Sequence, residues 1–142
     1  MKPYAFLKFC GIRIKMKKSI SKNIFTNFKS FIPIFLWAGL IFFLSHQPGL
    51  ASGFANAWDF FLRKAAHIFE FAVLTFLLIR NLEERNLEFK KALALSFLLA
   101  TLFAISDEYH QTFISAREGK ISDIGIDALG IIIAGWLSWK DK

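Results

Sequence analysis

The sequence has almost no cysteine and none of the common short catalytic motifs. Its single cysteine, Cys10, cannot close a disulfide within the chain, and without a cysteine cluster no structural zinc site is indicated. No zincin, P-loop or nucleophile-elbow motif is present. The chain also has no internal repeat and no low-complexity segment. These absences leave both metal and cofactor undefined, so any function has to be inferred from where the polar residues stand.

The composition also lacks the polarity of a soluble domain. Hydrophobic residues make up 55% of the 142 residues and the mean hydropathy is +0.44, whereas soluble domains are about 45–50% apolar. The net charge of +7 does not indicate a nucleic-acid partner, because eight of the 18 Lys and Arg lie within the first 29 residues, directly before the first apolar run. We therefore predict a basic cytoplasmic segment over residues 1–29 and a transmembrane domain over residues 30–142.

Long apolar runs free of polar residues are missing as well. The first apolar core, residues 31–44, has only 14 residues and follows a basic segment, which is also typical of a signal peptide. A cleavage site at Ala55-Asn56-Ala57 would stand 13 residues beyond that core, which is rather far. We therefore favour a retained helix of about 20 residues, long enough to span at 1.5 Å per residue.

Three further spans are predicted over about residues 63–80, 90–110 and 121–139. Their uncharged cores are too short to cross a hydrocarbon layer of about 30 Å, so each helix must include ionisable residues at one end. Between the first two spans, Phe54, Trp58, Phe61 and Leu62 share one helical face, and Ser52 could cap it, which predicts a short helix lying in the interface.

The positive charges predict the orientation of these spans. Fourteen Lys and Arg fall on the side of both termini and four on the other side. By the positive-inside rule both termini are cytoplasmic. The fold class is therefore an all-α membrane protein with four transmembrane helices, N-in and C-in, with a short interfacial helix in the first outer loop. We expect a multi-pass protein of the plasma membrane.

In this topology the ionisable residues of the spans gather at the outer ends. Because a charge at mid-membrane costs about 2.5–3.5 kcal/mol on insertion scales, residues at one depth should face each other or a wet cavity. The pairs His67–Glu70, Asp107–Gln111 and Asp123–Asp127 each share a helical face. One polar site is predicted. Its members also include His46, Glu108, His110 and Arg117.

Single members of this group also have structural interpretations. His67 could donate one structural hydrogen bond, Glu70 could pair with Arg63 or Arg117, and Asp123 or Ser122 could cap the fourth helix. Taken together, so many ionisable groups at one side of a small protein favour a ligand or substrate site.

At these residues the sequence resembles the VanZ-like family of small bacterial membrane proteins, over about residues 36–135. The resemblance rests on short polar elements placed against the four apolar spans. These are Ser45-His46-Gln47-Pro48, Lys64-Ala65-Ala66-His67 with Glu70-Phe71, Asp107-Glu108 with Gln111 and Phe113, Arg117, and Asp123 with Asp127 and Gly130. The sequence departs from the family pattern at Phe71, Ser115-Ala116 and Asp127, the last of which replaces a neutral amide by a carboxylate. The resemblance implies cell-envelope physiology and low-level teicoplanin resistance.

Four classes of function are compatible with the pattern. The first is an envelope protein that binds a lipid headgroup or cell-wall precursor, with Arg117 or Lys64 on phosphate and with Ser45, Gln47, Gln111 and Asp127 in the ligand site. The alternative is a membrane hydrolase or transferase, metal-assisted or not, whose catalytic residues are His67, Glu70, Asp107, Glu108 and Asp123. A proton- or ion-coupled transporter and a structural partner of another membrane protein are the third and fourth. The expected partner is membrane lipid, and the oligomeric state stays open.

Overall fold

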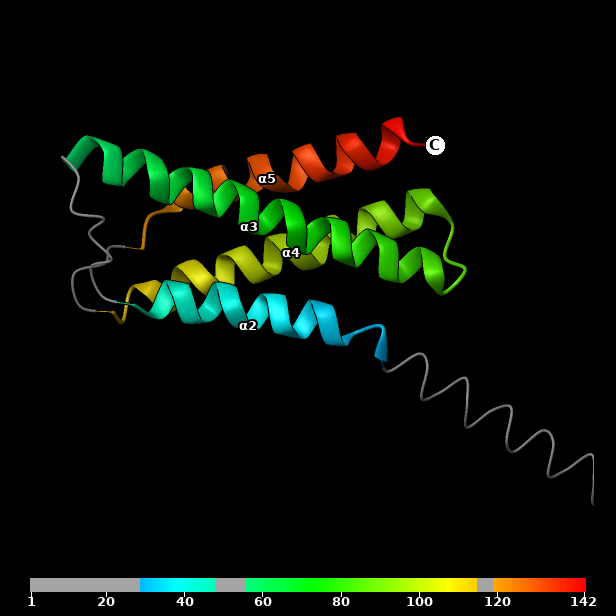
Figure 1. Cartoon of the computed structure of the whole chain (residues 1–142), viewed down its shortest axis with the longest axis horizontal. Helices are drawn as coiled ribbons and strands as arrows, with labels where there is room; N and C mark the ends of the chain where they lie inside the picture. The colour runs from blue at the N-terminus through cyan, green and yellow to red at the C-terminus, as the bar shows by residue number, and fades with distance from the viewer. Residues whose placement is uncertain (1–28, 48–55, 115–118) are drawn as a thin grey trace, which may run out of the picture. The chain divides into compact units, whose positions relative to one another are not determined.

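The computed structural model describes residues 29–47, 56–114 and 119–142, and these residues form helices and turns without any strand. The chain divides into two units, Met1–Ile32 and Pro33–Lys142, and everything below concerns the second. Its helices are α2 (Ile32–His46), α3 (Asn56–Glu84), α4 (Phe89–Gln111) and α5 (Ile121–Lys140) (Figure 1). The all-helical prediction is confirmed over these residues.

Three of the helices are long and apolar enough to cross a membrane. They are Phe60–Glu84 within α3, Phe89–Gln111 and Ile121–Lys140, whereas α2 is a shorter apolar helix of 15 residues. At 1.5 Å per residue α2 is about 22 Å long. It begins later than predicted, next to Pro33, which is tolerated in the first turn because the missing N–H has no helical acceptor there. Four complete spans therefore remain a prediction.

The separate interfacial helix is not confirmed. Trp58, Phe61 and Leu62 belong to the first two turns of α3, which runs without a break for 29 residues. Ser52 and Phe54 lie outside the described residues. The shared apolar face was read correctly as helical, but nothing in the sequence between residues 56 and 63 breaks the helix, so it continues into the span.

The turn between α3 and α4 has an identifiable end signal. Asn86 adopts a positive φ of 63°, the Leu87 amide donates to the Leu82 carbonyl at 3.2 Å, and the Asn86 amide donates to the Glu83 carbonyl at 2.8 Å. This is a Schellman motif with asparagine in the left-handed position. It reverses the chain in few residues and makes α3 and α4 antiparallel neighbours.

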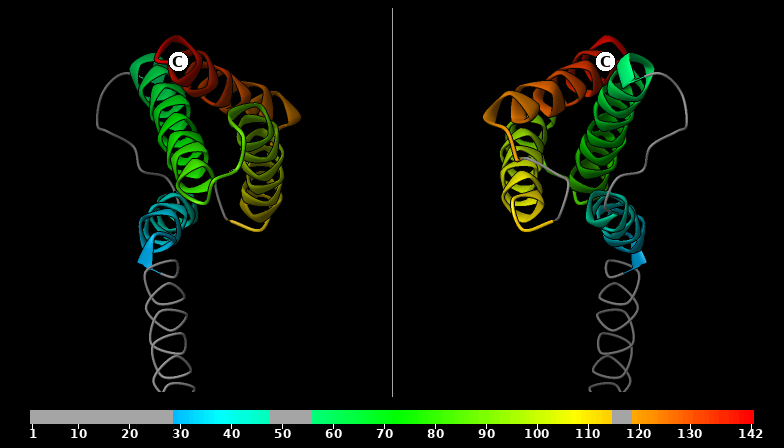
Figure 2. Two further views of the ribbon diagram at one scale, coloured as in Figure 1. Left: turned by 90° about the vertical axis from the view of Figure 1, so that its right-hand side faces the viewer. Right: turned by 90° about the vertical axis from the view of Figure 1, so that its left-hand side faces the viewer.

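The core lies among α3, α4 and α5. In Figure 2, which looks along the bundle from both ends, α5 packs over α3 and α4, while α2 lies on the opposite side of α3. Few apolar residues are buried, and large apolar side chains such as Leu98, Leu102 and Ile132 face outward. A large exposed apolar surface is what a protein in contact with lipid needs. The buried apolar residues are Ile41, Phe71, Leu74, Ile79, Ala92, Ala100, Ala104, Ile131 and Ala134, with Ile34 at the edge.

The crossing of α3 and α5 is close because α5 carries glycine where the helices meet. A Cβ added at Gly130 would run into the carbonyl oxygen of Ile68 and would stand 3.0 Å from the Ala72 nitrogen. Both obstacles are backbone atoms. Small residues at such positions let two membrane helices approach closely, and this approach fixes the register of the polar residues one turn before Gly130.

Candidate functional site

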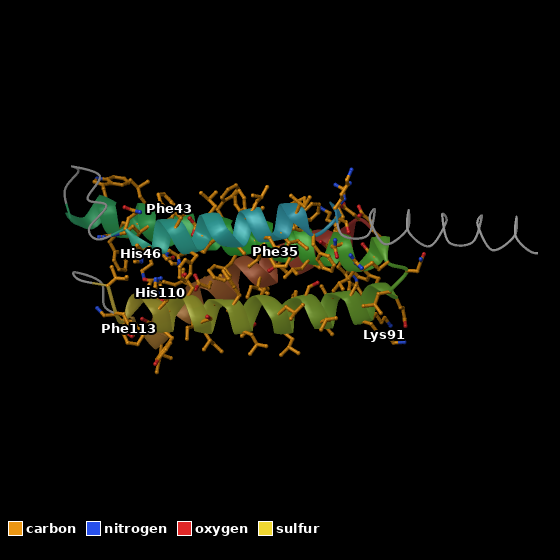
Figure 3. The ribbon with its side chains drawn as sticks, turned by 90° about the horizontal axis from the view of Figure 1, so that it is seen from below. Phe35, Phe43, His46, Lys91, His110 and Phe113 are labelled. Atoms are coloured by element: carbon orange, nitrogen blue, oxygen red, sulfur yellow. The ribbon has the colours of Figure 1, made fainter. Side chains whose placement is uncertain are left out.

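The polar residues predicted to converge lie at one end of the bundle, where α2 and α4 finish and α3 and α5 begin (Figure 1). In Figure 3, His46 of α2 and His110 of α4 stand together at this end, and Lys91 at the start of α4 stands at the opposite end. We use the name polar cluster for the following residues: Ser45, Lys64, His67, Glu70, Asp107, Glu108, Gln111, Asp123 and Asp127.

An ion pair and a histidine–carboxylate hydrogen bond join α3 to α5 within the polar cluster. Lys64 Nζ lies 2.5 Å from Asp123 Oδ1, and His67 Nδ1 lies 3.0 Å from Asp127 Oδ1. Lys64 and His67 are spaced i, i+3 on α3 and the carboxylates i, i+4 on α5, so each set occupies one helical face. The pairing of the two faces confirms that these residues are brought together.

Asp123 is not a helix cap. The cap position of α5 is occupied by Lys120, and no side chain makes a capping hydrogen bond there. Ser122 Oγ donates to Asp123 Oδ1 at 3.2 Å instead of to the backbone. The capping interpretation of Asp123 and Ser122 is therefore wrong, and Asp123 serves in the ion pair with Lys64.

Asp107 connects α2 with α4. Ser45 Oγ donates to Asp107 Oδ2 at 2.7 Å, and Gln111 Nε2 donates to the same oxygen at 2.9 Å. The Ser45 and Asp107 residues are 2% and 1% exposed. Hydrogen bonds to a charged acceptor in such a dry place are stronger than those at a surface, so Ser45 contributes to holding α2 against the bundle.

Replacing Ser45 by alanine is expected to destabilise the protein by about 1–2 kcal/mol, because Asp107 Oδ2 loses one of its two donors. Unfolding in mixed detergent micelles measures this loss. The matched control is Ser106→Ala, on an exposed position of the same end of α4. Equal stability of the two variants would show that the Ser45 hydrogen bond does not hold α2.

Glu108 is anchored by a backbone amide rather than by a side chain. The Lys120 amide donates to Glu108 Oε1 at 2.9 Å. Gly119 lies so close that an added Cβ would stand 2.6 Å from the Glu108 carbonyl oxygen. The segment before α5 therefore presses against the end of α4. The sequence could not have indicated this contact, because any residue type can supply a backbone amide.

Three carboxylates of the polar cluster each keep one buried oxygen without a hydrogen-bond partner among the described residues. These atoms are Asp107 Oδ1, Glu108 Oε2 and Asp127 Oδ2. The three residues are 1%, 4% and 0% exposed. Burying a polar atom unpaired costs about 1–3 kcal/mol, and more for a charged group, so three such atoms at one end of the bundle are unusual and require an explanation.

The three carboxylates also act on one another electrostatically. Asp127 interacts with Glu108 and with Asp107, and His67 interacts with Asp127, Asp107 and Glu70. Glu70 is buried at 9% exposure. The described buried residues at this end include four carboxylates and no lysine or arginine. The polar cluster is therefore rich in hydrogen-bond acceptors.

A histidine pair lies next to the polar cluster, and both residues were predicted at this polar end without a catalytic or ligand-binding role. His46 Nδ1 and His110 Nε2 lie 3.2 Å apart, and Phe42 stacks on the His110 ring with centroids 4.2 Å apart. The pair joins the ends of α2 and α4. Their common place at the outer ends of two spans was the only sequence signal, and it did not reveal that the rings touch.

For two predicted ligand-binding residues, a place in the polar cluster stays a prediction. Gln47 Nε2 donates to the Phe43 carbonyl of its own helix at 3.5 Å. Arg117 lies outside the described residues. Within residues 29–47, 56–114 and 119–142, no three of His, Cys, Asp and Glu are arranged so that they could hold a metal ion.

Comparisons with known proteins identify a family. A family model described as VanZ/LLP1 matches residues 13–140, which is nearly the whole chain. No curated protein and no solved structure gives a significant match.

Proposed function

The chain belongs to the VanZ/LLP1 family, and from this premise we propose that it is a multi-pass protein of the bacterial plasma membrane whose polar cluster faces outward and binds a polar headgroup. The headgroup belongs to a membrane lipid or to a lipid-linked cell-wall precursor. All four helices, α2 included, cross the membrane, and both termini are cytoplasmic. The distribution of Lys and Arg supports this orientation.

One observation carries the binding function. Asp107, Glu108 and Asp127 each offer a buried carboxylate oxygen that no described residue satisfies. If these carboxylates only held helices together, both oxygens of each would be bonded within the protein. Only one oxygen of each is bonded in this way. A ligand that supplies hydrogen-bond donors compensates the cost of burying them.

The position of these atoms suits a headgroup. Asp127 is six residues into α5, about 9 Å along the helix axis from its start. A headgroup at the interface can reach this depth between helix ends. The membrane-embedded sides of the helices are apolar, so the acyl chains of the same lipid would lie along them.

The proposed binding is tested by the molecules that stay bound to the purified chain. Native mass spectrometry of the full chain extracted from bacterial membranes should show a retained polar lipid on the wild type. Glu108→Gln, which preserves side-chain volume, should lower the occupied fraction at least tenfold. The control is Glu88→Gln, an exposed glutamate at the opposite end of α4. Absence of any retained molecule, or equal retention by both variants, would contradict the proposal.

The envelope role includes lowered susceptibility to teicoplanin, as in the family the chain resembles. Expression of the wild type in a sensitive bacterium should raise the inhibitory concentration of teicoplanin, and expression of Glu108→Gln at the same level should not. An equal rise with both proteins would mean that the polar cluster is not the part that acts on the envelope.

A further inference from the structure

The three unsatisfied oxygens say more about the ligand than that it is polar. As carboxylates all three are acceptors, and among the described residues no buried side-chain donor at this end of the bundle lacks a partner. The matching group must therefore donate hydrogen bonds. A phosphate group, which accepts them, would add like charge to an acidic place.

Lys64, one of the two residues predicted to hold a phosphate, is already engaged. Lys64 Nζ lies 2.5 Å from Asp123 Oδ1, and both side chains are only about one-fifth exposed, at 20% and 19%. Drawing Lys64 onto a phosphate would leave Asp123 to find another partner in a partly dry place. The geometry of this pair therefore argues against a phosphate beside the carboxylates.

Charge separates the remaining donor groups. Hydroxyls and amides are neutral, and they would add no positive charge to a place where the described buried residues include four carboxylates and no lysine or arginine. An ammonium group brings a positive charge and three N–H donors. Its charge-assisted hydrogen bonds to carboxylate are about twice as strong as neutral ones. We propose that the polar cluster receives the primary ammonium group of a lipid headgroup, which donates to unsatisfied carboxylate oxygens drawn from Asp107 Oδ1, Glu108 Oε2 and Asp127 Oδ2.

This inference rests on the proposed headgroup binding and gives its chemistry. The His67–Asp127 pair then has a positioning role, because the bond from His67 Nδ1 to Asp127 Oδ1 turns the second carboxylate oxygen, Oδ2, toward the ligand. Ser45 and Gln111 also have a positioning role, because both donate to Asp107 Oδ2 and leave Asp107 Oδ1 for the ligand.

Four lipids that differ only in the headgroup test the inference. The full chain in nanodiscs or detergent is titrated with phosphatidylethanolamine, phosphatidylcholine, phosphatidylglycerol and an N-acylated phosphatidylethanolamine of the same acyl chains. Binding is counted by native mass spectrometry. Phosphatidylcholine keeps the charge and has no N–H donor, phosphatidylglycerol has only hydroxyl donors, and the N-acylated lipid has lost the ammonium charge.

We expect phosphatidylethanolamine to bind at least tenfold more tightly than the other three. Free ethanolamine should compete for the site, and glycerol should not. The preference should vanish in Glu108→Gln and in Asp107→Asn and persist in Glu88→Gln. Circular dichroism of each variant restricts the comparison to folded protein, and two independent variants keep the test valid if one of them fails to fold.

Each other outcome has one meaning. A preference for phosphatidylglycerol that disappears in Glu108→Gln would overturn the ammonium and leave the headgroup site standing. Equal binding of phosphatidylethanolamine and phosphatidylcholine would overturn the role of the N–H donors. A preference that survives in both variants would place the ammonium elsewhere. No headgroup preference at all would overturn the inference together with the lipid part of the proposed function.

Discussion

Replacing Gly130 by alanine is expected to destabilise the protein by about 3 kcal/mol, the upper end of the cost of overpacking a tight interface. The new Cβ would meet the carbonyl oxygen of Ile68 and the nitrogen of Ala72, which are backbone atoms of α3 and cannot rotate away. α5 would have to move off α3. Since the same crossing sets His67 against Asp127, headgroup binding should fall together with stability.

Gly125 on the same helix provides the matched control. A Cβ there meets nothing within 4 Å, so Gly125→Ala should be neutral or stabilising by up to about 1 kcal/mol, the difference in helix propensity. Gly135→Ala should lie between the two, because the Cβ would meet the ring of Phe97, a side chain that can move. Unfolding in mixed micelles measures all three. Equal stability of the Gly130 and Gly125 variants would show that α3 and α5 do not cross here.

Removing His67 is expected to cost about 3 kcal/mol, the upper end of the cost of leaving a buried acceptor without its hydrogen-bond partner. In His67→Leu the fully buried carboxylate of Asp127 would lose the partner that lies 3.0 Å away. The cost comes from the unpaired carboxylate and not from the lost histidine packing. The double variant His67→Leu/Asp127→Leu should therefore recover most of the stability, because it removes the charge as well.

The four proteins of this double-mutant cycle are compared by the same unfolding measurement. A double variant that loses less stability than the sum of the losses in His67→Leu and Asp127→Leu shows that the two residues are coupled. Losses that simply add would mean that His67 and Asp127 are not paired. Neither leucine variant should bind a headgroup, since Asp127 is either missing or no longer held in position.

The sequence predicted the helical class and the end at which the polar residues meet. Periodicity and the short uncharged cores required His67, Asp107, Asp123 and Asp127 to lie within helices, and the structure places them in α3, α4 and α5. Because successive helices run antiparallel, the ends of α2 and α4 lie beside the starts of α3 and α5. The i, i+4 relation of Asp107 and Gln111 predicted that they share a helical face, and the structure adds a hydrogen bond between them at 2.9 Å.

The partners across helices could not be predicted, because they depend on how far one helix slides along the next. Gly130 of α5 packs against the backbone of Ile68, which lies one turn after Lys64 on α3. This contact sets the position of α5 along α3, and Asp123 then lies beside Lys64. Local sequence made Asp123 look like a cap, since capping residues and paired carboxylates are of the same type. The amide of Lys120 on Glu108 was hidden for a different reason, since it involves no side chain of Lys120.

The most direct test of the binding site is an experimental structure of the full chain grown from a lipidic phase containing phosphatidylethanolamine. Our account predicts density for a headgroup within hydrogen-bond distance of at least one of the oxygens Asp107 Oδ1, Glu108 Oε2 and Asp127 Oδ2. It would be contradicted by a dry polar cluster in which these three oxygens are satisfied by groups of the protein itself. In that case the carboxylates would serve to hold the helices together.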